Sequence, residues 1–279
     1  MPPLGIIAGL GELPVQVAAA ATERGQGIYV LRLKGFVEPL LDAYPGEVVN
    51  LAEIGKVIKA LHQAGCKQIC FAGIVKRPEL STLKPDLKGL ALLPRVLATA
   101  RKGDDALLSL LVDFFEAEGF EVIGAEVAAG HLKAGAGLLA GPEPDQNALS
   151  DLKKAALIAS EMGRLDIGQG AIVCRGLVLC VEAQEGTDAM LARCLSLPQE
   201  IRGQPGKPEG VLVKRPKPEQ ERRIDLPTLG ITTLEGAANA GLAGIGFAAG
   251  ASLLINAKAM YQRANELGVF LYGFPEDWA

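Results

Sequence analysis

Histidine, aromatic residues and net charge are all scarce in this sequence, and each shortage excludes a class of protein. Only two histidines occur among 279 residues, which makes a zinc site improbable. Aromatic residues form 5% of the chain, fewer than a β-sandwich usually contains. The formal net charge of -4 gives no overall basic field, so we expect no nucleic-acid partner.

Signals for export or membrane insertion are also lacking. The N-terminus has no basic region followed by a cleavage site, and the five cysteines are odd in number and unevenly spread, as is typical of reduced thiols in a cytosolic protein. A charge-free run over residues 236–257 is long enough to cross a bilayer, but its glycines, asparagines and serine favour a helix end, a turn and a buried strand. We therefore expect a cytoplasmic protein.

Glycine and apolar residues are abundant instead, with 34 glycines and an apolar fraction of 49%. In the first half, short apolar runs typical of strands alternate with amphipathic stretches typical of helices. This alternation predicts a Rossmann-like domain with a parallel sheet over residues 1–127. The predicted strands cover residues 4–8, 27–33, 68–74 and 120–125, and the predicted helices cover residues 14–24, 53–63 and 105–118.

The pattern changes over residues 128–147, which are rich in glycine, alanine and proline, and we predict an inter-domain linker there. Residues 148–279 predict a second domain of α/β or α+β class whose topology the pattern does not reveal. Two apolar runs around Arg175 and Gly176 indicate a β-hairpin, and residues 186–194 a short helix.

A glycine-rich turn, Gly9-Leu10-Gly11, follows the first predicted strand. Glycines there would let the backbone approach a phosphate, and the following helix would offer unpaired N–H groups. A plain strand–turn–helix junction explains the turn equally well. A nicotinamide-cofactor site is a weaker interpretation, since proline replaces the third glycine of that fingerprint and Arg32 and Lys34 stand where an acid would hold the ribose.

Three carboxylates, Glu182, Glu185 and Asp188, fall within seven residues directly after a predicted strand. With Gly186 allowing a tight turn, they could bind a hard cation through oxygen. In the alternative interpretation, Thr187 or Asp188 only caps the following helix and the glutamates are solvated.

A cationic stretch from Lys214 to Arg223 precedes Asp225, which lies between two apolar residues. A carboxylate in such surroundings requires a metal or a cation as a partner. Cations beside acids suit a pyrophosphate held with a divalent metal. The alternative is a charged loop in which Asp225 pairs with Arg222 or Arg223. Elsewhere, Gly73, Ile74 and Lys76 are compatible with a sugar or phosphate contact, while Asp104 or Asp105 could simply cap a helix.

Together these stretches resemble the LpxI family of UDP-2,3-diacylglucosamine pyrophosphatases, over essentially the whole chain. The residues that carry the resemblance are 9–14, 72–78, 103–108, 166–169, 182–190 and 217–230. It implies a two-domain fold with a glycolipid-nucleotide substrate held between the domains. It also implies hydrolysis to UMP and 2,3-diacylglucosamine 1-phosphate in lipid A synthesis, with Mg²⁺ or another divalent cation such as Mn²⁺.

The resemblance also implies roles for particular residues. Asp225 and Asp188 would be catalytic residues and metal ligands. The substrate-binding residues would be Gly9, Leu10, Gly11, Gly73, Ile74, Lys76, Asp104, Gln169, Thr187, Lys214, Gln220 and Arg222. Peripheral contact with the cytoplasmic face of the inner membrane is a further expectation, and the oligomeric state stays open. Two other functions compete: a nucleotide-lipid carrier without turnover, and an NADP-dependent oxidoreductase.

Overall fold

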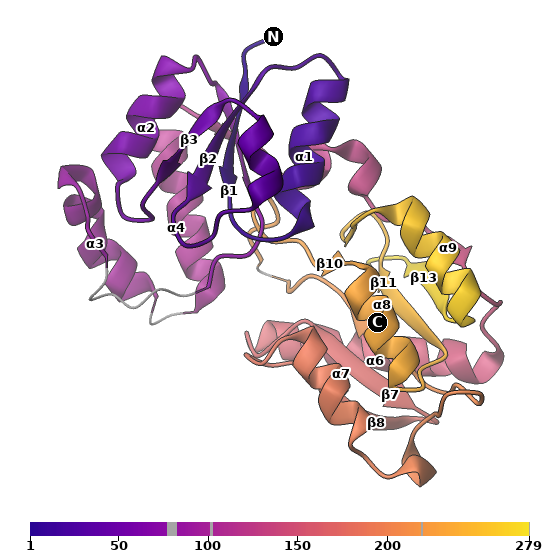
Figure 1. Cartoon of the computed structure of the whole chain (residues 1–279). Coiled ribbons are helices and arrows are strands. Elements are labelled where there is room, and N and C mark those ends of the chain that lie inside the picture. Colours follow the sequence, from indigo (N-terminus) through magenta and orange to yellow (C-terminus); the bar gives the residue numbers. More distant parts are fainter. Residues whose placement is uncertain (77–82, 101–102, 219, 279) are drawn as a thin grey trace. The chain divides into compact units, whose positions relative to one another are not determined.

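The computed structural model describes residues 1–76, 83–100, 103–218 and 220–278 (Figure 1). The chain divides into two compact units. The first contains Met1–His131 together with Glu221–Asp225, and the second contains Leu132–Gln220 and Leu226–Ala279. A five-residue segment from late in the sequence therefore belongs to the first unit.

The first unit is built on a five-stranded parallel sheet in the order β3-β2-β1-β4-β5. Its strands are β1 (Leu4–Ala8), β2 (Ile28–Leu33), β3 (Gly46–Val49), β4 (Gln68–Ala72) and β5 (Glu121–Val122), and its helices are α1 (Glu12–Glu23), η1 (Pro39–Ala43), α2 (Ile54–Gln63), α3 (Leu87–Thr99), α4 (Asp104–Ala117) and α5 (Ala125–Ala128). The predicted Rossmann-like fold is confirmed. Because β1 has β2 on one side and β4 on the other, the order in which strands are added to the sheet reverses at β1. Such a switch point is where α/β proteins commonly bind ligands.

One core of this unit lies between the sheet and two helices. Val57, Ile58 and Leu61 of α2 pack with Val112 and Phe115 of α4 against the strands. Their spacing of three or four residues places them on one face of each helix, as amphipathic helices require. Ile224, from the late segment, packs against the same core.

The second unit contains a six-stranded mixed sheet in the order β6-β13-β11-β9-β7-β8 and a small parallel pair, β10 and β12 (Figure 1). The strands β9, β11 and β13 are parallel, whereas β6 and β7 run antiparallel to their neighbours. The bounds are β6 (Gly137–Ala140), β7 (Gly170–Cys174), β8 (Leu177–Val181), β9 (Val211–Lys214), β10 (Thr228–Leu229), β11 (Gly244–Ala248), β12 (Leu253–Leu254) and β13 (Phe270–Phe274). The second α/β domain is thereby confirmed. Its mixed sheet topology was not predicted from the sequence.

Helices cover both faces of the mixed sheet. The helices are α6 (Gln146–Arg164), α7 (Thr187–Leu195), η4 (Gln199–Ile201), α8 (Ile231–Asn239) and α9 (Ala257–Leu267). Leu152, Ala155 and Ala159 of α6 belong to one buried cluster, and residues of α7, α8 and α9 belong to another. The charge-free run over residues 236–257 is used as predicted, in a helix end, a turn and buried strands.

The predicted hairpin is present between β7 and β8. Arg175 and Gly176 at its tip have φ angles of 51° and 74°, the left-handed conformation of a tight two-residue turn. The buried carboxylate of Asp151 on α6 accepts hydrogen bonds from both of their backbone N–H groups, at 2.8 and 2.7 Å. Asp151 is thus a structural carboxylate with both of its oxygens occupied.

The region predicted as a linker, residues 128–147, contains the boundary between the units at His131 and Leu132. It also contains η3 (Gly130–Leu132) and β6, which pairs with β13. Within the described ranges, no helix is long and apolar enough to cross a membrane. The five cysteines are buried and form no disulfide; burial raises the pKa of the Cys70 and Cys194 thiols to about 12.

Candidate functional site

Two backbone loops meet at the carboxyl edge of the parallel sheet. The Leu10 N–H donates to the Ile74 carbonyl at 3.0 Å, and the Ile74 N–H donates back to the Leu10 carbonyl at 2.8 Å. A Cβ at Gly9 would lie 2.6 Å from the Ile74 oxygen, and one at Gly73 would lie 2.7 Å from the Leu10 oxygen. Glycine at both positions therefore permits the close approach. The structure brings these residues, which are predicted substrate contacts, close together.

Gly11 occupies the N-cap of α1, with a φ of 98°. Its N–H donates to a carboxylate oxygen of Glu38 at 3.3 Å. A helix N-terminus favours negative charge, so Glu38 occupies the kind of position that an anionic ligand would take. Lys76 follows β4 and is exposed. Glu38 was absent from the predicted site, because its place in the sequence gives no sign of this contact.

Arg32 does not serve the cofactor role that the nicotinamide hypothesis required. Its side chain is buried, its guanidinium donates to the Leu41 carbonyl at 2.9 Å, and it lies 3.4 Å from Asp42. These contacts hold η1 against the sheet. One of the residues that motivated an NADP site, Arg32, is therefore engaged in contacts within the first unit.

The second unit has three buried polar side chains linked by hydrogen bonds near the carboxyl ends of β8 and β9. The Lys214 Nζ, at the end of β9, donates to the Thr187 Oγ1 at 2.8 Å. The Thr187 hydroxyl, at the start of α7, donates to a carboxylate oxygen of Glu182 at 2.7 Å. All three side chains are buried, with exposed fractions of 6%, 9% and 6%. Lys214 and Thr187 are both predicted substrate contacts. They are far apart in the sequence, but their side chains are in direct contact.

Gln169 belongs to the same edge. It precedes Gly170, which pairs with Lys214 in the sheet, and its carbonyl accepts from the Arg215 N–H at 3.1 Å. Its side-chain oxygen is buried and lacks a hydrogen-bond partner within the part of the chain that the structure describes. Gln220 is also buried, and its side-chain oxygen accepts from the Lys217 N–H at 2.8 Å.

The helix-capping interpretation of the acidic stretch is wrong for Thr187 and Asp188. The N-cap of α7 is Gly186, with a φ of 80° and no side-chain cap hydrogen bond, and Thr187 turns toward Glu182 instead. Asp188 is exposed in the first turn of α7, where the helix dipole favours a negative charge. Glu185 pairs with Arg193 at 2.7 Å, and this contact lowers the pKa of the Glu185 carboxyl.

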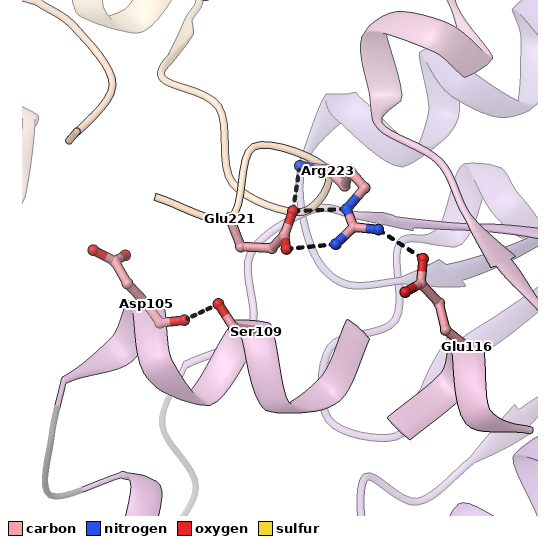
Figure 2. Close-up of polar contacts among 5 residues, drawn as sticks. All are labelled: Asp105, Ser109, Glu116, Glu221 and Arg223. Atoms are coloured by element: carbon pink, nitrogen blue, oxygen red, sulfur yellow. Dashed lines mark hydrogen bonds and ion pairs between the residues drawn. The ribbon is translucent and has the colours of Figure 1, made fainter. Parts of the chain in front are cut away.

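Asp225 ends the late segment of the first unit, Glu221–Asp225, which forms a tight turn. The Glu221 carbonyl accepts from the N–H groups of Ile224 and Asp225 at 3.1 and 3.0 Å. Figure 2 shows the Arg223 guanidinium between two carboxylates. It donates to both carboxylate oxygens of Glu221, at 2.9 and 2.8 Å, and its third nitrogen donates to Glu116 of α4 at 2.6 Å. Arg223 thus links the turn that contains Asp225 to the helix α4.

Removing this fastening should loosen the turn. The Arg223 guanidinium, hydrogen-bonded to Glu221, holds the pKa of that carboxyl below its usual range. A lowered carboxyl pKa adds stability above the ordinary pKa, and that stability is lost as the pH falls through the folded-state value. At neutral pH, Arg223→Ala should cost local stability of about 1 kcal/mol or less, because the pair is partly exposed. Hydrogen exchange of the Ile224 and Asp225 amides would measure it.

The matched control is Arg263→Ala. Arg263 is 40% exposed, as is Arg223, and it also bridges two carboxylates, but on α9 and α8 of the other unit. Its loss should leave protection of residues 224 and 225 unchanged. Equal protection in wild type and Arg223→Ala at neutral pH would contradict the fastening role, as would a difference that persists at a pH below the Glu221 pKa.

Not every predicted site residue can be compared with the structure. α4 begins at Asp104 with Gly103 as its N-cap, but the Asp104 side chain lies outside the described part. Arg222 is exposed in the late segment. Asp188 and Asp225, the two predicted metal ligands, belong to different units. In the described ranges, no three side chains of histidine, cysteine, aspartate and glutamate gather as a preformed metal site.

The described fold is that of a two-unit α/β protein with a Rossmann-like first unit. In α/β sheets, strand ends and helix N-termini are common places for phosphate-bearing ligands. Residues 3–132 match the LpxI N-terminal domain, and residues 135–272 match the LpxI C-terminal domain. A relative from Caulobacter vibrioides (strain ATCC 19089 / CIP 103742 / CB 15), named "UDP-2,3-diacylglucosamine pyrophosphatase LpxI", is 51% identical over 270 residues, which is 97% of this chain and 96% of the relative. The chain belongs to the LpxI family.

Proposed function

We propose that this protein hydrolyses UDP-2,3-diacylglucosamine to UMP and 2,3-diacylglucosamine 1-phosphate, a step in lipid A biosynthesis. The observation that carries the proposal is the 51% identity, along almost the full length of both chains, to a relative named for this pyrophosphatase activity. In the reaction, water adds to one phosphorus and the bond to the bridging oxygen breaks. The bridging oxygen leaves with the other phosphorus, so each product carries one phosphate.

The side chains of both units suit a diphosphate. The buried ammonium of Lys214 supplies positive charge in a place of low dielectric constant, where its attraction for a phosphate oxygen is strongest. The glycine loops around Gly11 and Gly73 offer backbone close to the sheet edge, as phosphate contacts require. Asp225, on the turn fastened by Arg223, would orient the attacking water and accept its proton.

A divalent cation, Mg²⁺ or Mn²⁺, is part of the proposal. Magnesium is usually bound by one or two carboxylates together with substrate phosphates, so a preformed cluster of three acids is not required. Asp225 and Asp188 are the carboxylates we assign to it. Such a cation would stabilise the charge that develops on the phosphoryl oxygens.

Contact with a membrane surface is a further part of the proposal, because a diacylated substrate resides in a bilayer. Leu87 and Leu90 of α3 support it, since these large apolar side chains are 86% and 53% exposed. Flotation with lipid vesicles would test this part; protein that stays at the bottom of the gradient with every vesicle composition would refute it.

The assay that tests the function is release of UMP from purified protein, substrate and Mg²⁺. We expect UMP and the sugar 1-phosphate in equal amounts, and loss of both when EDTA removes the cation. Restoration by excess Mg²⁺ is the control for chelator effects. Intact substrate that co-purifies with the protein and persists in Mg²⁺ would instead indicate a carrier, and full activity in EDTA would refute the metal requirement.

A further inference from the structure

Glu182 is a buried carboxylate that the proposed mechanism leaves without a role. It is 6% exposed, and among the described residues its side chain has one hydrogen-bond partner, the neutral hydroxyl of Thr187. Its second oxygen, Oε2, lacks a hydrogen-bond partner among the residues that the structure describes. A charge buried in this way is costly unless something compensates for it, and the nearest cation in the chain of contacts is Lys214.

The chemistry of the three groups gives the chain a direction. A carboxylate can only accept, and an ammonium can only donate. The single Thr187 proton therefore goes to Glu182, and the Thr187 oxygen accepts from Lys214. This arrangement uses one of the three N–H donors of Lys214. Glu182 thereby determines the orientation of the hydroxyl to which Lys214 is bound.

The backbone holds the carboxylate in place. The Glu182 N–H donates to the Gly170 carbonyl at 2.8 Å, and a Cβ at Gly170 would lie only 2.5 Å from the Glu182 Oε2. At Gly168, a Cβ would collide with the Glu182 carbonyl oxygen. Two glycines therefore give Glu182 room against the start of β7, and any larger residue there would displace it.

We infer that Glu182 is a positioning residue, which acts through Thr187 to hold the Lys214 ammonium in place for an anionic phosphate ligand. The inference rests on the proposed function for the identity of that ligand, a sugar-linked diphosphate. Asp151 provides the contrast within the same unit. It is equally buried, at 4%, but both of its oxygens accept backbone N–H groups of a turn, so it has only a structural role.

A double-mutant cycle tests the coupling. Glu182→Ala should lower kcat/KM about 10- to 100-fold, the range for losing a hydrogen bond to a charged group. Combined with Lys214→Ala, it should add little to the loss from Lys214→Ala alone, because both remove the same positioned ammonium. Asp151→Asn, the control, should leave kcat/KM unchanged. Independent, multiplicative losses for Glu182→Ala and Lys214→Ala would overturn the inference.

A second readout needs no turnover. Under trace labelling with acetic anhydride, Lys214 should react several-fold faster, relative to the exposed Lys154 of the same unit, in Glu182→Ala than in wild type. If Glu182→Ala does not fold, Thr187→Val removes the linking hydroxyl at constant shape and should give the same increase. Unchanged Lys214 labelling in these variants would overturn the positioning role, whereas absence of UMP release from wild type would overturn only the proposed function.

Discussion

Asp225→Asn should lower the turnover number for UMP release by about 10²- to 10⁴-fold, the range that general base catalysis contributes. The amide has the shape of the carboxylate, but it carries no charge to hold a cation and accepts no proton from water. Because Asn fits the same space, the tight turn closed by the Glu221 carbonyl should persist. We therefore expect a protein that folds and binds substrate but hardly turns it over.

Two measurements separate loss of chemistry from loss of structure. Single-turnover kinetics should show a slow chemical step with substrate still bound, and amide exchange at Ile224 should match wild type. Asp113→Asn, at an exposed carboxylate on α4 of the same unit, is the matched control and should keep full turnover. Turnover near that of wild type in Asp225→Asn would rule out Asp225 as the catalytic acid–base.

The fold of the first unit could be predicted because its signals are local. Most of its strands contain short apolar runs, and α2 has one apolar face formed by Val57, Ile58 and Leu61, so periodicity indicates the alternation of strands and helices. The short strand β3 and the helix α3 were not predicted. The second unit mixes parallel and antiparallel strands. Its order depends on which distant strands pair, for example β6 with β13, and no local pattern encodes that choice.

The sequence indicates individual candidate residues for the site, but it does not indicate how these residues are arranged. Lys214 and Thr187 were both expected to bind substrate, yet nothing in their spacing shows that they touch, since 27 residues separate them. Glu182 was taken for one of several acids after a strand. The signal that distinguishes it is the glycine on each side of Gln169, which matters only once β7 and β8 are paired.

The late segment shows a second limit of sequence reasoning. Arg223 was considered as a partner for Asp225, but its guanidinium binds Glu221 and Glu116. Glu116 lies 107 residues earlier, on a helix of the first unit. Charge spacing could not identify a carboxylate so distant in the sequence. The contact exists because residues 221–225 belong to the first unit, although the residues on either side of them belong to the second.

Gly73→Ala should lower kcat/KM by about 100-fold, because a displacement of about 1 Å at a positioning backbone can cost that much. Gly73 has a φ of 94°, which is strained for alanine, and its new Cβ would lie 2.7 Å from the Leu10 carbonyl oxygen. The Leu10–Ile74 backbone pair must open to admit the methyl group. The glycine loops would then separate at the switch point of the sheet, where we expect the substrate.

Gly65→Ala is the control that isolates this effect. Gly65 ends α2 in the same unit with a φ of 74°, but nothing lies within 4 Å of a Cβ built there. The Gly65→Ala variant should be destabilised only by the backbone strain, about 1 to 3 kcal/mol, and its kcat/KM should be unchanged. Thermal unfolding should therefore show both variants destabilised, with activity lost in Gly73→Ala alone. Equal kcat/KM values for the two variants would show that the paired loops do not position the substrate.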